Sequence, residues 1–316
     1  MKRDRILQRL GYTIPPGAAM RVIVDTDAKN EADDQYAIMH HLLTPSFDVR
    51  GIIATHFESK AKSTGETMEM SYQEVLRVME LAQIDDIPVL RGCPLPLTDI
   101  GDAPDSDGVN FLIDEARRED SRPLYIAVQG AMTNVAAALN KAPDIAKKLI
   151  ILWNGGGPYP MGRREFNLMQ DPDACRVVLE SEAQVWQIPQ NVYAGLEVTL
   201  AELSYKVRPC GRIGEYLFDQ LVKQNHQDYN PFFLLRTGEN WTLGDNTTIA
   251  VLLQNHFRGN WHETKAPKIR DDLTYAENPT GKTIRVYDSI DVRMTLEDFF
   301  AKLNLAYSGR MNHESV

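Results

Sequence analysis

The chain has 316 residues, of which 43% are hydrophobic and 25% are charged, and its formal net charge is -10. This length and composition suit one large globular α/β domain. Nucleic-acid-binding proteins usually present a basic face. This chain is acidic and has no cluster of Lys and Arg beyond short pairs, so nucleic acids and anionic membrane surfaces are disfavoured as partners.

Cysteines and apolar runs exclude further classes. Cys93, Cys175 and Cys210 are far apart and form no Cys-x-x-Cys pair, which predicts neither a thiolate zinc site nor a disulfide framework. The stretch from Met1 to Tyr12 is charged throughout and does not resemble a signal peptide. No run approaches the ~18 apolar residues of a membrane span. We therefore expect a cytoplasmic protein with a helical extension over residues 1–20 and a single domain over residues 21–310.

Short apolar runs alternate with segments of helical periodicity along the chain. The expected helices cover residues 2–10, 33–43, 69–82, 133–139, 172–181, 211–224, 245–254 and 295–303. The expected strands cover residues 21–24, 49–54, 87–90, 124–128, 149–153, 184–188 and 282–286, the last of them in a hairpin with residues 288–292. This alternation predicts an α/β fold with an open, mostly parallel sheet, helices on both faces and a Rossmann-like core. Ligands of such sheets bind at the carboxyl ends of the strands.

The connection after the first strand is strongly acidic. It holds Asp25, Asp27, Asp33 and Asp34. One Asp at a helix start is commonly a cap, but four adjacent carboxylates repel one another unless a cation neutralises them. Calcium and magnesium prefer such oxygen ligands. An Asp-x-Asp after a strand also occurs in phosphotransferases, so a magnesium-dependent phosphotransferase is one alternative.

Three later segments carry further polar residues at expected helix starts. They are Gly130-Ala131-Met132-Thr133-Asn134, then Glu165-Phe166-Asn167 followed by Asp171-Pro172-Asp173-Ala174, and finally Gly244-Asp245-Asn246. Helix capping explains each of them singly. Together with the acidic turn, and in this order, they resemble the nucleoside hydrolases of the inosine-uridine preferring type. The resemblance covers residues 20–305.

The resemblance implies a nucleoside hydrolase-like fold and a role for each matching residue. Calcium would be held by four residues, namely Asp27, Asp34, the backbone carbonyl of Thr133, and Asp245. Asp33 would hold a ribose hydroxyl, while Glu165 and Asn167 would hold the ribose near its 5′-hydroxyl. Asp25 would orient the turn. Further candidates for substrate contacts are Asn154, Trp153 and His56.

The same resemblance implies an activity. A homodimeric or homotetrameric N-glycosyl hydrolase would use Ca²⁺ to cleave ribonucleosides, or related N-ribosyl compounds, into ribose and free base in purine or pyrimidine salvage. Asp27 would activate a metal-bound water.

The sequence departs from the family pattern in three places. The turn between Asp27 and Asp33 is two residues longer and lacks the usual Pro-Gly. The Asn that the family places after its second strand is not evident in the matching stretch Thr55-His56-Phe57-Glu58. Gly244 stands where the family often has a His that protonates the leaving base. Trp153 or Trp241 could stack on the base, and His56 is a substitute acid. A hydrolase of another N-glycoside, or a homologue that binds ribose ligands without hydrolysis, therefore remains an alternative.

Overall fold

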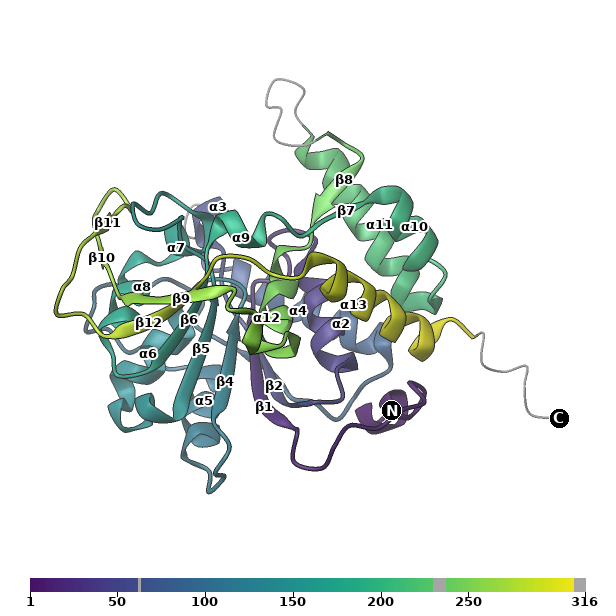
Figure 1. Cartoon of the computed structure of the whole chain (residues 1–316), viewed down its shortest axis with the longest axis horizontal. Helices are drawn as coiled ribbons and strands as arrows, with labels where there is room; N and C mark the ends of the chain where they lie inside the picture. The colour runs from purple at the N-terminus through teal and green to yellow at the C-terminus, as the bar shows by residue number, and fades with distance from the viewer. Residues whose placement is uncertain (62–63, 230–236, 310–316) are drawn as a thin grey trace.

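The computed structural model describes residues 1–61, 64–229 and 237–309 of the chain, without the side chains of residues 60–61. Its centre is an eight-stranded sheet in the order β3-β2-β1-β4-β5-β6-β12-β9 (Figure 1). Neighbouring strands run parallel except for β9, which is antiparallel to β12. The strands, in sheet order, are β3 (Val89–Arg91), β2 (Phe47–Ala54), β1 (Met20–Thr26), β4 (Leu124–Val128), β5 (Leu149–Asn154), β6 (Gln184–Ile188), β12 (Thr283–Tyr287) and β9 (Trp261–Lys265).

Helices cover both faces of the sheet because successive strand residues point to opposite sides. In β1, Val22 and Val24 face one hydrophobic core and Ile23 faces the other. The first core is closed by α2 (Asp34–Leu43), α4 (Thr67–Ala82), α11 (Gly211–Asp228), α12 (Thr247–Leu253) and α13 (Val292–Tyr307). The second is closed by α5 (Asp107–Arg117), α6 (Thr133–Lys141) and α8 (Pro172–Glu180). The predicted α/β sheet with helices on both faces is confirmed (Figure 1).

Shorter elements complete the described chain. They are α1 (Arg3–Gln8), α3 (Glu58–Ala61), η1 (Pro143–Lys148), α7 (Phe166–Gln170), α9 (Gln190–Tyr193), β7 (Glu197–Thr199), α10 (Leu200–Lys206), β8 (Asn240–Thr242), η2 (Gly244–Asn246), η3 (His256–Arg258), β10 (Lys268–Ile269) and β11 (Tyr275–Ala276). Two antiparallel pairs, β7 with β8 and β10 with β11, lie outside the main sheet. Among the described helices, none is long and apolar enough to cross a membrane.

One predicted connection is wrong. Residues 282–286 were expected to pair with residues 288–292, but β12 pairs with β9 and β6. The side chain of Asp291 accepts a hydrogen bond from the backbone N of Met294 and so caps α13, which places the following residues in a helix. The expected end of the domain at residue 310 lies outside the described residues.

Candidate active site

The acidic turn begins where β1 ends, at the carboxyl edge of the sheet. Asp25 is fully buried, and its carboxylate accepts a hydrogen bond from Nδ2 of Asn134 at 3.0 Å. Asp27 is also buried, and its Oδ2 accepts from Nδ2 of Asn30, one residue of the lengthened turn. Asp25 therefore supports the turn from within, while Asp27 lines the cleft above it.

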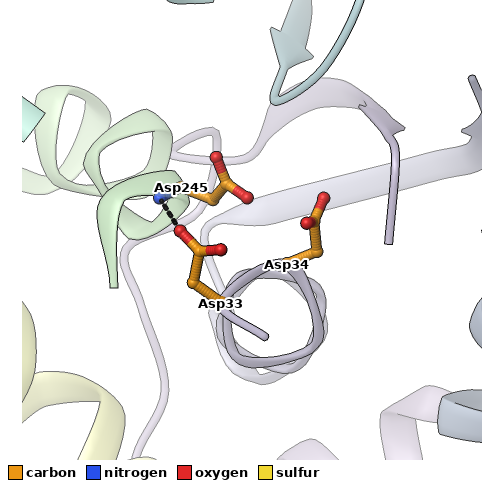
Figure 2. Close-up of side chains that lie close together, drawn as sticks. All are labelled: Asp33, Asp34 and Asp245. Atoms are coloured by element: carbon orange, nitrogen blue, oxygen red, sulfur yellow. Dashed lines mark hydrogen bonds between the residues drawn. The ribbon is translucent and has the colours of Figure 1, made fainter. Parts of the chain in front are cut away.

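Three carboxylates converge next to this turn. Asp33 and Asp34 come from the start of α2 and Asp245 from η2, and each offers an oxygen within 4.8 Å of the other two (Figure 2). Oδ2 of Asp33 accepts a hydrogen bond from the backbone N of Asp245 at 3.3 Å, which joins the two segments. The side chain of Asp33 makes no capping bond to α2. Helix capping therefore does not explain this carboxylate.

Burial and mutual repulsion disfavour the charged forms of these acids. Burial raises the pKa of Asp34 to about 7, against the hydrogen bond from Thr26. Burial, with Asp34 beside it, raises the pKa of Asp33 well above its usual value. Burial and the neighbouring aspartates do the same to the pKa of Asp245. A hard divalent cation would relieve this repulsion, and the all-oxygen donor set suits calcium or magnesium.

Carboxamides hold the acids in place. Asn154, at the end of β5, donates from Nδ2 to Oδ1 of Asp245 at 2.8 Å, and its Oδ1 accepts from the hydroxyl of Thr247. Nδ2 of Asn167 donates to the backbone oxygens of Gln129 and Asn154 at 3.2 Å and 2.8 Å. These bonds connect the ends of β4 and β5 to η2 and α7.

Glu165 accepts hydrogen bonds from four donors. As the N-cap of α7, it accepts from the backbone N atoms of Asn167 and Leu168. It also accepts from the backbone N of Gly156 at 2.7 Å and from the hydroxyl of Tyr193 at 2.7 Å. Four donors therefore fix its orientation.

These groups surround one cleft of about 210 Å³ at the carboxyl ends of β1, β4 and β5, where parallel sheets place their ligands. Its described lining is predominantly polar. The lining residues are Asp27, Asn30, Glu31, Asp33, Asp34, Gln129, Asn154, Glu165, Phe166, Asn167, Tyr193, Ala194, Thr242, Gly244 and Asp245.

Comparison with known proteins identifies the family. The sequence profile of the inosine-uridine preferring nucleoside hydrolases matches residues 22–298. The chain belongs to this family. One curated relative, the pyrimidine-specific ribonucleoside hydrolase RihA of Salmonella dublin, is 30% identical over 206 residues. That match spans 57% of this chain and 61% of RihA, which is less than two thirds of the relative's length.

Solved structures show the same fold. The purine-preferring ribonucleoside hydrolase from Gardnerella vaginalis superposes with a TM-score of 0.69 and 24% identity, over 90% of this chain and 99% of that one. The type III effector protein XopQ, solved in complex with adenosine diphosphate ribose, superposes with a TM-score of 0.68 and 16% identity, over 96% and 98% of the two chains.

The structure brings most of the residues inferred from the family pattern to the cleft. Those that line it are Asp27, Asp33, Asp34, Asn154, Glu165, Asn167 and Asp245. The three carboxylates that lie within 4.8 Å of one another are those of Asp33, Asp34 and Asp245. The family pattern implies Asp27 as a metal ligand and Asp33 as a ribose contact, so the cluster differs from that pattern at these two residues.

Besides Asp25, four other candidates do not line the cleft. Trp153 is buried in the second hydrophobic core because strand alternation turns it away from its neighbour Asn154. The hydroxyl of Thr133 donates to Asp171 at 2.7 Å and contacts Nε2 of His56 at 2.8 Å. His56 is fully buried, and burial lowers its pKa to about 4. Trp241, the other stacking candidate, lies in the first core.

Eight of the lining residues were not among the candidates, and Gln129 and Tyr193 are two of them that hydrogen-bond to other residues of the site. Gln129 directly follows β4, and its place at the end of a predicted strand at the carboxyl edge was a usable indication. Tyr193 ends α9, a helix of only four residues, and no motif or periodicity in the sequence indicates it.

Proposed function

We propose that this protein is a calcium-dependent hydrolase that cleaves the N-glycosidic bond of ribonucleosides to give ribose and free base. The observation that carries the proposal is the convergence of Asp33, Asp34 and Asp245 beside Asp27 in one polar cleft of a nucleoside hydrolase fold. Family membership supports the reaction class.

The acids of the cleft suit the charge that the reaction develops. Cleavage of an N-glycosidic bond builds positive charge on the sugar, as glycoside hydrolysis does, and fixed carboxylates stabilise such charge. Asp27 is the proposed base that takes the proton of the attacking water. Glu165 and Asn167 are proposed to hold the 5′ end of the ribose.

Asp27, Asp34 and Asp245 are the proposed side-chain ligands of Ca²⁺, with Asp33 shared between the ion and the ribose. When bound, the cation would supply a fixed frame for the ribose hydroxyls and would acidify the attacking water. The family pattern implies Thr133 as the backbone ligand. Gln129 is a second candidate for the backbone ligand, because it lines the cleft. Its backbone carbonyl accepts one hydrogen bond, from the side-chain amide of Asn167, and has a second lone pair.

The proposal is tested by incubating the purified full chain with inosine, uridine and 4-nitrophenyl riboside, before and after treatment with a chelator. We expect ribose release that is lost on chelation and restored by Ca²⁺. Turnover of a different N-glycoside alone would favour another substrate class. Tight riboside binding without turnover would favour a non-catalytic binding protein. A phosphotransferase would instead be favoured if the chain released phosphate from an added phosphate ester in Mg²⁺ and left the three ribosides intact. The homodimer or homotetramer that we also propose is tested by light scattering of the same sample.

A further inference from the structure

The lengthened turn between Asp27 and Asp33 is bonded to Glu74, a residue of α4. Oε2 of Glu74 accepts a hydrogen bond from Nζ of Lys29 at 2.9 Å, and the two side chains form an ion pair. The Glu74 side chain is only 6% exposed, whereas that of Lys29 is 43% exposed. Salt screens such a partly buried pair less than a surface pair. The ion pair therefore fixes the turn at Lys29.

The other oxygen of Glu74 connects the turn to two helices. Oε1 of Glu74 accepts from Nε2 of Gln35 at 3.0 Å and from the hydroxyl of Tyr216, which lies on α11. The same Nε2 of Gln35 donates to the backbone oxygen of Ala28 at 2.6 Å. Gln35 directly follows Asp34 on α2. Glu74 therefore holds the first half of the turn and the start of α2 in one network of hydrogen bonds.

The turn presents an amide to the carboxylate of Asp27. Asn30 is 8% exposed, and its Nδ2 donates to Oδ2 of Asp27 at 3.2 Å. Its backbone N also donates to the backbone oxygen of Asp27 at 2.7 Å. Lys29 is the residue immediately before Asn30. A displacement of Lys29 would therefore also displace the amide that orients Asp27.

We propose that Lys29 and Glu74 are positioning residues, whose ion pair holds the lengthened turn so that Asp27 is directed towards the cation site. Neither of the two side chains lines the cleft, so both act through the turn. The inference rests on the proposed function, which makes Asp27 a ligand of Ca²⁺.

The charges of the two residues alone would have a different effect. Lys29 repels a nearby cation and Glu74 attracts it, so through-space effects of removing these charges on Ca²⁺ affinity would have opposite signs. A positioning role predicts weaker binding after the loss of either partner, because the ion must then order the turn itself. The two losses should not add, since each variant removes the same bond.

The test is a calorimetric titration of Ca²⁺ into the full chain after removal of bound metal. Lys29→Met and Glu74→Gln should each weaken Ca²⁺ binding ~10-fold, a loss typical of residues that orient metal ligands. Lys29→Met should have no further effect in the Glu74→Gln background. Lys29→Arg keeps a cation for Glu74 and should bind Ca²⁺ nearly as tightly as the wild type.

The matched control is Glu69→Gln, which removes the same charge from α4 at a 43% exposed side chain that pairs with Arg91 instead. It should keep the Ca²⁺ affinity of the wild type. Melting curves in chelator check that each variant is folded. If Glu74→Gln does not fold, the comparison of Lys29→Met with Lys29→Arg still decides, because Lys29 is largely in solvent contact.

Tighter Ca²⁺ binding by Lys29→Met would overturn the inference, as would losses that add in the double variant or a wild type that binds no Ca²⁺. Turnover of 4-nitrophenyl riboside is measured separately. Ca²⁺ affinities that follow the predicted pattern without any turnover would refute the hydrolase function but support the positioning role. Turnover together with Ca²⁺ affinities that are unchanged in both single variants would do the reverse.

Discussion

Side-chain amides around the cleft each donate a hydrogen bond to one carboxylate. Asn134 donates to Asp25, and Asn154 donates to Asp245. A hydrogen bond to the charged form of a carboxyl opposes the effect of burial on its pKa. Each amide also fixes the direction in which its acid points. Residues that hydrogen-bond to metal ligands commonly have this role in other proteins.

Asp27 is the residue on which the proposed chemistry depends most. Asp27→Asn removes the base but keeps the size of the side chain and its place beside Asn30. A carboxylate near a cation is a weakened base, yet general-base catalysis is typically worth ~10²–10⁴-fold. We therefore expect kcat for 4-nitrophenyl riboside to fall at least ~100-fold in saturating Ca²⁺.

The matched control is Asp219→Asn, at a half-exposed side chain on α11 that does not line the cleft, which should retain wild-type kcat. Melting curves of both variants in Ca²⁺ would show that the fold is kept. Activity of the Asp27 variant within tenfold of the wild type would remove Asp27 from the base role.

At the scale of helices and strands, the position of a site residue along the sheet could be predicted better than the direction of its side chain. The strands β4 and β6 were predicted with their observed bounds and β5 to within one residue, because continuous apolar runs leave little choice of structure. A strand end locates a residue at the edge of the sheet, but the direction of its side chain alternates from one residue to the next. Asn154 and Trp153 are adjacent, and only Asn154 lines the cleft.

Local patterns failed where long-range pairing decided the outcome. The hairpin expected after residue 282 has the apolar content of two strands, but the cap formed by Asp291 starts a helix and the distant β9 supplies the partner. The helix α9 is too short to show a period, so Tyr193 could not be found from the sequence.

The link between β2 and α6 has a testable pH dependence. The hydroxyl of Thr133 donates to Asp171, so Nε2 of His56 must donate to Thr133, and the neutral imidazole fits. Burial lowers the pKa of His56 from 6.5 to about 4. Between these values the unfolded chain takes up a proton that the folded chain does not. His56 therefore contributes its full share to the free energy of unfolding above pH 6.5. As the pH falls from 6.5 towards 4, its protonation in the unfolded chain lowers the free energy of unfolding by about 3 kcal/mol.

His56→Gln keeps a donor to Thr133 but cannot titrate in this range. Urea unfolding at pH 7 and pH 4.5 should show a smaller loss of unfolding free energy for this variant than for the wild type. His226→Gln, at an exposed side chain on α11, is the control and should lose as much as the wild type. An unchanged loss in His56→Gln would show that protonation of His56 does not contribute.

At the scale of the whole molecule, the fold gathers acids from segments that are far apart in sequence. Asp34 begins α2, and Asp245 lies in η2 before α12. Both helices pack on the same core, so the hydrophobic effect that assembles this core also forces the carboxylates together. The stability of the whole chain should therefore depend on what neutralises them.

Calcium should accordingly stabilise the protein in a pH-dependent way. At 100 times its dissociation constant, a bound ion adds about 2.7 kcal/mol, which corresponds to a rise in Tm of roughly 5 °C for a chain of this size. Without a cation, burial raises the pKa of Asp34 to about 7, so the folded chain holds a proton there that the unfolded chain releases above pH 3.8. The stability of the metal-free protein should fall as the pH rises through this window, and at pH 5.5 protons compete with Ca²⁺.

Scanning calorimetry at pH 5.5 and pH 8, with Ca²⁺ and with a chelator, measures both effects. The gain in Tm from Ca²⁺ should be larger at pH 8 than at pH 5.5. Asp34→Asn removes one repelling charge and one ligand but keeps an acceptor for the hydroxyl of Thr26. It should raise the Tm of the metal-free protein at pH 8 and reduce the gain from Ca²⁺. These two changes occur together only if Ca²⁺ neutralises this cluster, because a distant ion would leave the repulsion between the carboxylates intact. A gain that is independent of pH and unchanged in the variant would therefore show that Ca²⁺ acts elsewhere.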